Sequence, residues 1–431
     1  MTKKSKEWYI KVADSEQRYT WFDDVRKKLD FFKAEDDKAR KLSSVSINKV
    51  PMYLKDNRDA YEPRVVSLGI FHRRISQPLS EIELYKVEAV KRFVKRLPEA
   101  QHHAHFLVER VQQLLPEIIA SYEGETECEQ EILAWLFTLD GCFILETLRL
   151  LSDEPQWNVD PVFNRNRVRS CQFDTLTDLL LLENQVPIVL LLRLLEMEEK
   201  LSEETVGTEL LRMICDGIIA LAHPFSYSLQ QKKGEQATEY KEREAKLRKA
   251  LQLKYKNLHE YNHILRFLHD FIVHVSETTH EAEDIEDVHI TVPDGVHHHR
   301  HRDLLMASAT ELCNKGMKII PYEGVPSAKS LCFDTQKRSL FLPVIWISDT
   351  TEMIFRNLMA MDVCQEKELS VISEYGFLMN RLIQSEKDMA LLRKKGIIQS
   401  SIGSYKEASD LFKGLAKGLT SLSLTKISLQ N

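Results

Sequence analysis

The sequence lacks the paired cysteines and the secretory features of an exported protein. Its seven cysteines are scattered, odd in number and form no CxxC pair. This usage is typical of the reducing interior of a cell and not of a disulfide framework. The first residues, MTKKSKEWYIKVADSEQRY, are partly basic but precede no apolar run, so they do not form a signal peptide. We therefore expect a cytoplasmic protein.

The chain also lacks a clean hydrophobic run and an excess of positive charge. Its richest apolar region, Leu176 to Leu195, contains Asp178, Glu183, Pro187 and Arg193 within the about 20 residues that a membrane span requires. The formal net charge is −6 at pH 7, with a pI near 6.2. Such a balance gives no electrostatic case for nucleic acid. We expect no nucleic-acid partner and no transmembrane segment in this chain.

Several catalytic signatures are missing as well. The sequence contains no GxSxG, no phosphate-binding glycine loop, no dinucleotide fingerprint and no Cys/His zinc framework. No Pro/Gly/Ser-rich linker cuts the 431 residues, of which 43% are hydrophobic and 29% charged. This composition predicts one large, loosely bipartite globular unit. We expect no cofactor and no enzymatic activity.

Helical periodicity is the main pattern that is present, so we expect a mainly α fold. Short β-prone runs predict a small antiparallel β element at about residues 316–345, in which Ser330–Asp334 and Ser339–Pro343 form a hairpin. The parts that we expect are a charged helical N-terminal extension (1–44), a helical body that opens with INKVP (45–275), an acidic and histidine-rich mobile loop (276–303), and a C-terminal helical part with the small sheet (304–431).

Two polar features fall within apolar helical sequence. Asp140 interrupts an apolar face, and a buried carboxylate there must find hydrogen-bond partners. In DLLLLENQVPIVLLLRLL, residues 178–195, Pro187 suits the first turn of a new helix. We therefore expect Glu183, Asn184 and Gln185 to form a tight corner between two apolar helices, where they satisfy backbone groups.

One segment, HEYNH at residues 259–263, fits the H-E-x-x-H motif of zinc peptidases. In that motif His259 and His263 hold Zn²⁺ with His269 as a third ligand, and Glu260 is the general base. A helical projection through Leu258 and Ile272 places both histidines of the motif on the face opposite the apolar stripe, toward water. Arg266 also stands where the third-ligand pattern requires glycine. We expect no metal site, and a zinc hydrolase is the alternative.

Five blocks of sequence resemble the plant-specific domain-of-unknown-function 247 family. The first is INKVPMYLKDNRDAYEPRVVSLGIFH, residues 47–72, and the others follow in the family order. The resemblance implies structural roles for Ile47, Val50, Pro51, Tyr61, Pro63, Gly69, His72, Asp140, Phe143, Glu183, Asn184, Gln185, Pro187, Glu311, Leu312, Asn357 and Asp388.

The same resemblance implies an interaction or recognition protein with an unknown protein partner, in cell signalling or at grass self-incompatibility loci. Family members often end in a hydrophobic segment that anchors them at the plasma membrane. This chain ends GLAKGLTSLSLTKISLQN, which is too polar to span a bilayer. The charged segment Lys232–Lys256 leaves a peripheral membrane protein as a further alternative.

Overall fold

The computed structural model describes residues 45–72, 81–124, 126, 128–151, 174–198, 203–220, 236, 238, 258, 261–274, 307–322, 332–334, 337–364, 371–400 and 404–417. The chain divides into two compact units, Met1–Val45 and Ser46–Asn431. Three predicted segments lie outside the described residues: the extension at 1–44, the loop at 276–303 and nearly all of the basic segment at 232–256.

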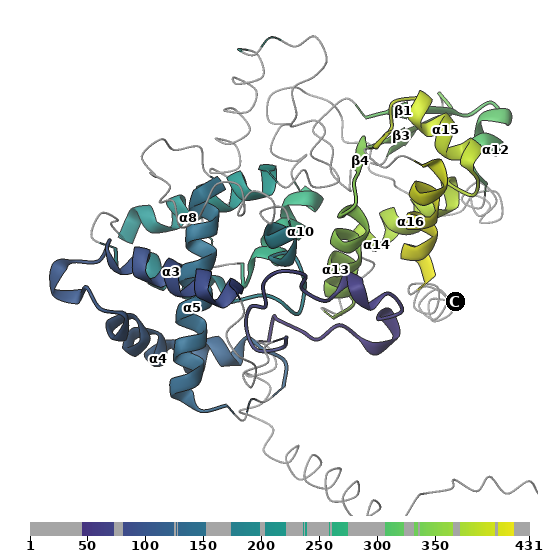
Figure 1. Ribbon diagram of the computed structural model, residues 1–431. Helices are drawn as coiled ribbons and strands as arrows, with labels where there is room; N and C mark the ends of the chain where they lie inside the picture. The colour runs from purple at the N-terminus through teal and green to yellow at the C-terminus, as the bar shows by residue number, and fades with distance from the viewer. Residues whose placement is uncertain are drawn as a thin grey trace, which may run out of the picture. The chain divides into compact units, whose positions relative to one another are not determined.

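Helix α5, Gln130–Leu151, is the central element of the helical body (Figure 1). All residues from 133 to 149 except Trp135 and Leu139 are buried, because this helix is apolar on almost every side. It contacts α3, α4, α7 and α8. The helices of the body whose bounds the described residues give, besides α5, are α3 (Glu81–Val94), α4 (Ala104–Ala120), α7 (Ile188–Leu195), α8 (Glu203–Ala220) and α10 (Ile264–His274), with short 3₁₀ turns η1 (Met52–Leu54), η2 (Arg58–Ala60) and η3 (Glu99–Gln101).

Helices α5 and α7 approach closely at Gly141. A Cβ atom at this position would lie 2.4 Å from Cδ1 of Leu194, well inside van der Waals contact. A glycine inside a helix costs about 1 kcal/mol relative to alanine. The close approach of the two helices explains its presence here.

Buried charges also join the helices of the body. Arg149 on α5 pairs with Glu146 at 2.8 Å and with Glu198, just beyond α7, at 2.7 Å. Arg96, which follows α3, contacts both of these carboxylates. The set holds two cations and two anions, so the charges compensate one another inside the protein.

The C-terminal part is also built mainly from helices, and the mainly α fold class is confirmed. Helix α14 packs against α13 and α16, and α15 packs against α12 and α16. The bounds are α12 (Ala309–Asn314), β1 (Lys318–Pro321), β2 (Cys332–Asp334), β3 (Ser339–Leu342), β4 (Ile345–Ile347), α13 (Thr351–Cys364), α14 (Val371–Leu382), α15 (Glu386–Lys394), β5 (Ile398–Ser400) and α16 (Tyr405–Lys417).

The prediction of an antiparallel β element is wrong for two of the three strand pairings. The hairpin of β2 and β3 is antiparallel, with Phe333 opposite Leu340. Strand β1, however, pairs with β3 in parallel, and β4 pairs in parallel with β5, which the sequence suggested was helical. Parallel partners need a crossover connection. Here β2 lies within one crossover and α13, α14 and α15 lie within the other.

Candidate functional site

The INKVP segment forms an irregular strap, residues 46–72, over the helical body. Its regular structure is limited to η1, η2 and one parallel bridge between Ile47 and Tyr122. Seven apolar strap residues are buried, so water does not reach most of the backbone beside them. Backbone N–H groups in such a place need acceptors from elsewhere in the protein. The buried apolar residues are Ile47, Val50, Leu54, Ala60, Tyr61, Val66 and Leu68.

Asp178 supplies acceptors for three consecutive strap residues. Its carboxylate accepts the N–H groups of Arg64, Val65 and Val66 at 2.9, 2.7 and 2.8 Å. Burial raises the pKa of this carboxyl, and the three N–H donors oppose the increase. One side chain therefore fixes the direction of the strap over three residues.

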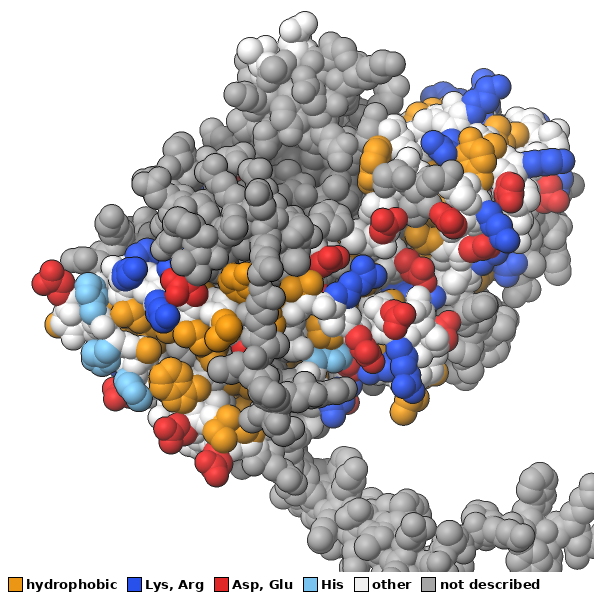
Figure 2. Space-filling view, in the orientation of Figure 1, with side chains coloured by type: hydrophobic (Ala, Val, Ile, Leu, Met, Phe, Trp, Pro, Cys, Tyr) orange, Lys and Arg blue, Asp and Glu red, His pale blue; other side chains and the backbone are white. Residues whose placement is uncertain are grey.

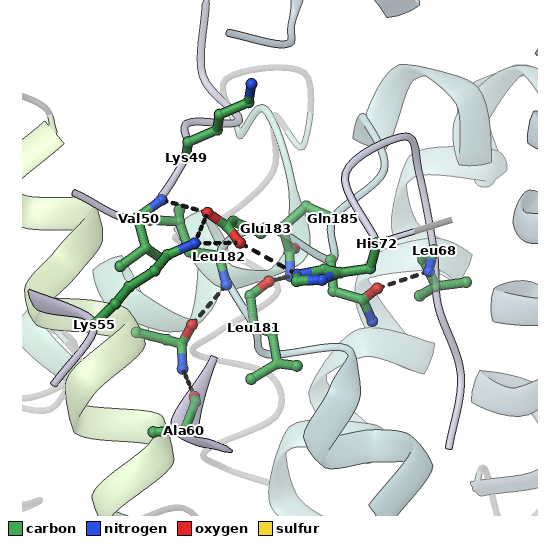
Figure 3. Close-up of polar contacts among 12 residues, drawn as sticks. Lys49, Val50, Lys55, Ala60, Leu68, His72, Leu181, Leu182, Glu183 and Gln185 are labelled. Atoms are coloured by element: carbon green, nitrogen blue, oxygen red, sulfur yellow. Dashed lines mark hydrogen bonds and ion pairs between the residues drawn. The ribbon is translucent and has the colours of Figure 1, made fainter. Parts of the chain in front are cut away.

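Glu183 holds the beginning of the strap (Figure 3). It accepts the Val50 N–H at 2.7 Å and the Lys55 ammonium at 2.8 Å, and Nε2 of His72 lies 3.3 Å from its other oxygen. Burial alone would raise the pKa of Glu183, but hydrogen bonds from His72, Lys55 and the Val50 N–H lower it to about 2. The carboxylate is therefore ionised whenever the protein is near neutral pH.

Asn184 and Gln185 bond backbone groups through their side-chain amides. Asn184 Oδ1 accepts the Leu68 N–H at 2.7 Å, and its Nδ2 donates to the carbonyls of Val66 and Asp178. Gln185 Nε2 donates to the carbonyls of Leu179 and Leu181. Its Oε1 accepts the N–H of Leu265 on α10 at 3.1 Å. We call Asp178, Glu183, Asn184 and Gln185 the polar corner.

The backbone around the polar corner differs from the prediction. The sequence indicated two apolar helices that meet there, but the helix before it ends at residue 178, and residues 179–187 are not helical. Pro187 is the N-cap of α7 and not a residue of its first turn. Along this irregular stretch the side chains of Glu183 and Asn184 bond the strap, while that of Gln185 bonds backbone groups outside it.

Asp140 on α5 and Lys86 on α3 form a fully buried ion pair beneath the end of the strap. Asp140 accepts the Gly69 N–H at 2.9 Å and Lys86 Nζ at 2.7 Å. Lys86 also donates to the Ser67 carbonyl at 2.6 Å and lies 3.0 Å from Glu83. Its place in the same stripe as Ala89, Val90 and Phe93 was the signal of its burial.

Gly69 has no room for a side chain. Its φ is +63°, and a Cβ atom would lie 2.6 Å from the Tyr122 hydroxyl and 2.7 Å from the Gln185 carbonyl oxygen. These two groups are themselves hydrogen-bonded at 2.7 Å. Only glycine therefore allows the strap to turn here without displacing the hydrogen bond below it.

Asn357 on α13 joins the polar corner and the strap to the C-terminal helices. Its Oδ1 accepts the Leu182 N–H at 2.8 Å, and its Nδ2 donates to the carbonyls of Ala60 and Met353. The preceding residue, Arg356, pairs with Asp56 of the strap at 3.0 Å. The strap therefore bridges two parts of the chain that are far apart in sequence.

The predicted orientation of His263 is wrong. His263 is fully buried and faces the strap, because α10 begins only at Ile264 and the helical projection through residues 258–272 does not apply. Its Nε2 lies 3.1 Å from the Ser46 carbonyl, and its Nδ1 accepts the Arg266 N–H at 3.2 Å. Burial lowers the pKa of His263 to about 4. With both ring nitrogens bonded, His263 has no lone pair left for zinc.

Of the other residues of the alternative zinc site, only His269 is among the described residues. His269 bonds Asp362 of α13 at 2.6 Å, while His259 and Glu260 lie outside the described residues. Within the part of the chain that the structure describes, no group of three or more His, Cys, Asp and Glu side chains is arranged to hold a metal ion.

The remaining predicted residues occupy structural positions. Glu311 closes a capping box with Ser308, and Asp388 closes another with Ser385. Asp388 also accepts the Thr310 N–H at 2.8 Å, which ties α12 to α15. Phe143 and Leu312 are core residues, Pro51 and Pro63 are half-buried, and His72 is held by Glu183.

Comparison with known proteins places this arrangement in a family. The sequence profile of DUF247, described as "Plant protein of unknown function", matches residues 47–429. The chain belongs to the domain-of-unknown-function 247 family. Within it, the chain is 24% identical to the putative UPF0481 protein At3g02645 of Arabidopsis thaliana, over 94% of this chain and 84% of the relative. It is 25% identical to UPF0481 protein At3g47200 of the same plant, over 87% and 73%. No solved structure matches.

Among the residues of this DUF247 chain that the structure describes, every helix is too short or too polar to cross a membrane.

Replacement of Lys86 by methionine tests the buried ion pair. We expect Lys86→Met to lower the free energy of unfolding by about 3 to 5 kcal/mol, because it leaves the Asp140 carboxylate buried without its cation. Urea unfolding at pH 7 measures the change. The matched control is Lys91→Met in the same helix, whose exposed pair with Glu88 predicts a loss under about 1 kcal/mol. Equal losses for the two variants would contradict the prediction.

The pH dependence of stability tests the buried histidine. Between the ordinary pKa of 6.5 and the folded value of about 4, the unfolded chain binds a proton that the folded chain does not. Stability should therefore fall by about 3 kcal/mol as the pH drops through this window, at about 1.4 kcal/mol per pKa unit. Stability should fall further as the pH drops from 4.5 toward 2, because Glu183 is then protonated.

Urea unfolding of His263→Asn at pH 7, 5.5 and 4.5 isolates the histidine. Asparagine retains the hydrogen bond to the Arg266 N–H at the start of α10, so the slope between pH 7 and 4.5 should disappear. His103→Asn, at the exposed cap of α4, should keep the slope of the unaltered protein. A slope that persists in His263→Asn would exclude this histidine as its source.

Proposed function

We propose that this chain is a non-enzymatic plant interaction protein that presents the strap to a protein partner. The observation that carries the proposal is the attachment of an irregular segment by side chains from α5, the polar corner and α13. Recognition residues are often on loops that a rigid scaffold positions. The setting in cell signalling or at grass self-incompatibility loci, which the family resemblance implies, is part of the same proposal.

The use of the buried polar groups supports this proposal. A catalytic site needs acids, bases or nucleophiles aimed at a space where substrate binds. Here Asp140, Asp178 and Glu183 accept strap N–H groups, and His263 is bonded at both ring nitrogens. Their chemistry is directed at the backbone of the chain itself.

Metal analysis separates this proposal from the zinc-peptidase alternative. We expect the purified full chain to be folded without stoichiometric zinc and to cleave no peptide substrate, because His263 offers no free nitrogen. Stoichiometric zinc that is lost in His263→Ala would overturn the proposal. Glu260→Gln provides a second variant, since loss of peptidase activity with retained zinc would identify a catalytic base.

Proximity labelling in plant tissue tests the interaction itself. A biotin ligase fused to the full chain should label a reproducible set of proteins that also co-purify with the chain. Glu183→Gln, which weakens the hold on the strap, should reduce that labelling, whereas Lys91→Met should leave it unchanged. Labelling that is identical for both variants would contradict a role for the strap.

A further inference from the structure

Two large apolar side chains stand next to each other on the outer side of the strap. Met52 is 84% exposed and Tyr53 is 52% exposed, while the next residue, Leu54, is buried. Other exposed large hydrophobic residues in the described part of the chain are Leu84, Ile132 and Tyr405, and each lies alone in the sequence. We call Met52 and Tyr53 the strap tip.

Glu183 fastens the chain on both sides of the strap tip. Its carboxylate accepts the Val50 N–H before the tip and the Lys55 ammonium after it (Figure 3). Within the tip, the N–H groups of Leu54 and Lys55 donate to the carbonyls of Pro51 and Met52. The short turn is therefore closed by internal bonds and attached at both ends. Met52 and Tyr53 are held outward and do not fold back on the apolar body.

Such a preformed turn suits binding to a partner. Ordering a flexible loop lowers affinity, and a loop that is already ordered avoids most of that loss. Tyrosine is enriched among the residues that dominate binding energy, and methionine adapts its shape to irregular pockets. We propose that the strap tip is the surface through which this chain binds a folded protein whose apolar pocket receives Met52 and Tyr53. This inference rests on the proposed function and identifies its contact surface.

The charges around the strap tip favour a protein over a lipid surface. An anionic bilayer attracts segments with an excess of Lys and Arg. The exposed charged residues nearby have both signs, and red and blue side chains intermingle where Figure 1 draws the strap (Figure 2). A mixed polar rim around an apolar centre is typical of protein interfaces. These charged residues are Lys49, Asp56, Arg58, Asp59 and Glu62.

The small size of the exposed strap surface predicts a weak complex. Exposed strap residues between positions 49 and 62 number seven, whereas a standard interface uses about 20 to 30 residues on each side. The strap alone therefore supports a transient complex, with a dissociation constant on the order of micromolar. In such a complex each large apolar side chain accounts for a large share of the binding, about tenfold or more in affinity.

Site-specific photo-cross-linking of the full chain tests this surface. Tyr53 is replaced by the photoreactive amino acid p-benzoylphenylalanine, and the protein is irradiated in a plant extract. Control proteins carry the same amino acid in place of Leu84 or Ile132, which are 58% and 40% exposed. We expect a protein adduct from position 53 and none from the controls. Excess unaltered chain should compete for the partner and reduce the yield of this adduct, whereas an excess of the Met52→Asp variant should not.

Direct binding of the identified protein completes the test. Met52→Asp should weaken the affinity about tenfold or more, and Leu84→Asp should leave it unchanged. Both substitutions lie at exposed positions, so urea unfolding should be the same for the two variants. Equal affinities for Met52→Asp and the unaltered chain would overturn the inference.

Other outcomes separate this inference from the proposed function. Adducts from position 84 or 132 but not from 53 would overturn the strap tip as the binding surface. They would still support the proposal that the chain is an interaction protein. Lipid adducts, or flotation with vesicles of phosphatidylcholine and phosphatidylserine that Met52→Asp abolishes, would replace the protein partner with a membrane. The absence of adducts at all three positions would overturn both proposals.

Discussion

Backbone N–H groups that lose contact with water and find no acceptor each cost about 1 to 3 kcal/mol, and an irregular segment has no ladder to pair them. Residues 46–72 face this constraint because seven of their apolar side chains are buried while most of their backbone is neither helix nor sheet. Side chains of the helical body take the place of a neighbouring strand. Asp178 alone accepts three successive N–H groups. The fold around the polar corner is organised to place those acceptors.

This constraint also accounts for charge in the interior. A carboxylate is a strong acceptor, but its burial is unfavourable unless a cation or several donors accompany it. Asp140 is accompanied by Lys86 and the Gly69 N–H. Glu183 is accompanied by Lys55, His72 and the Val50 N–H. Asn184 and Gln185 provide acceptors without charge. The mixture of charged and neutral acceptors limits how much ionic charge the core contains.

The sequence predicts part of this arrangement. The helix class, the antiparallel hairpin and the turn at Pro187 follow from spacing and backbone chemistry within a few residues. The burial of Asp140 also follows, because it interrupts an apolar face. Its partner Lys86 does not, since the pair depends on how α3 packs against α5. The orientation of His263 is predicted wrongly for a different reason. A helical projection assumes a helix, and α10 begins only at Ile264, one residue after this histidine. Strand β5 is missed because its partner lies more than 50 residues earlier.

Asn357 has a consequence for the order of assembly during synthesis. Its side chain donates to the carbonyl of Ala60, 297 residues earlier in the chain. At about 5 to 20 residues per second, the ribosome needs roughly 15 to 60 s to extend the chain from one to the other. Throughout that interval Ala60 lacks the hydrogen bond from Asn357. The strap can therefore gain its attachment to α13 only after more than 350 residues of the chain have been synthesised.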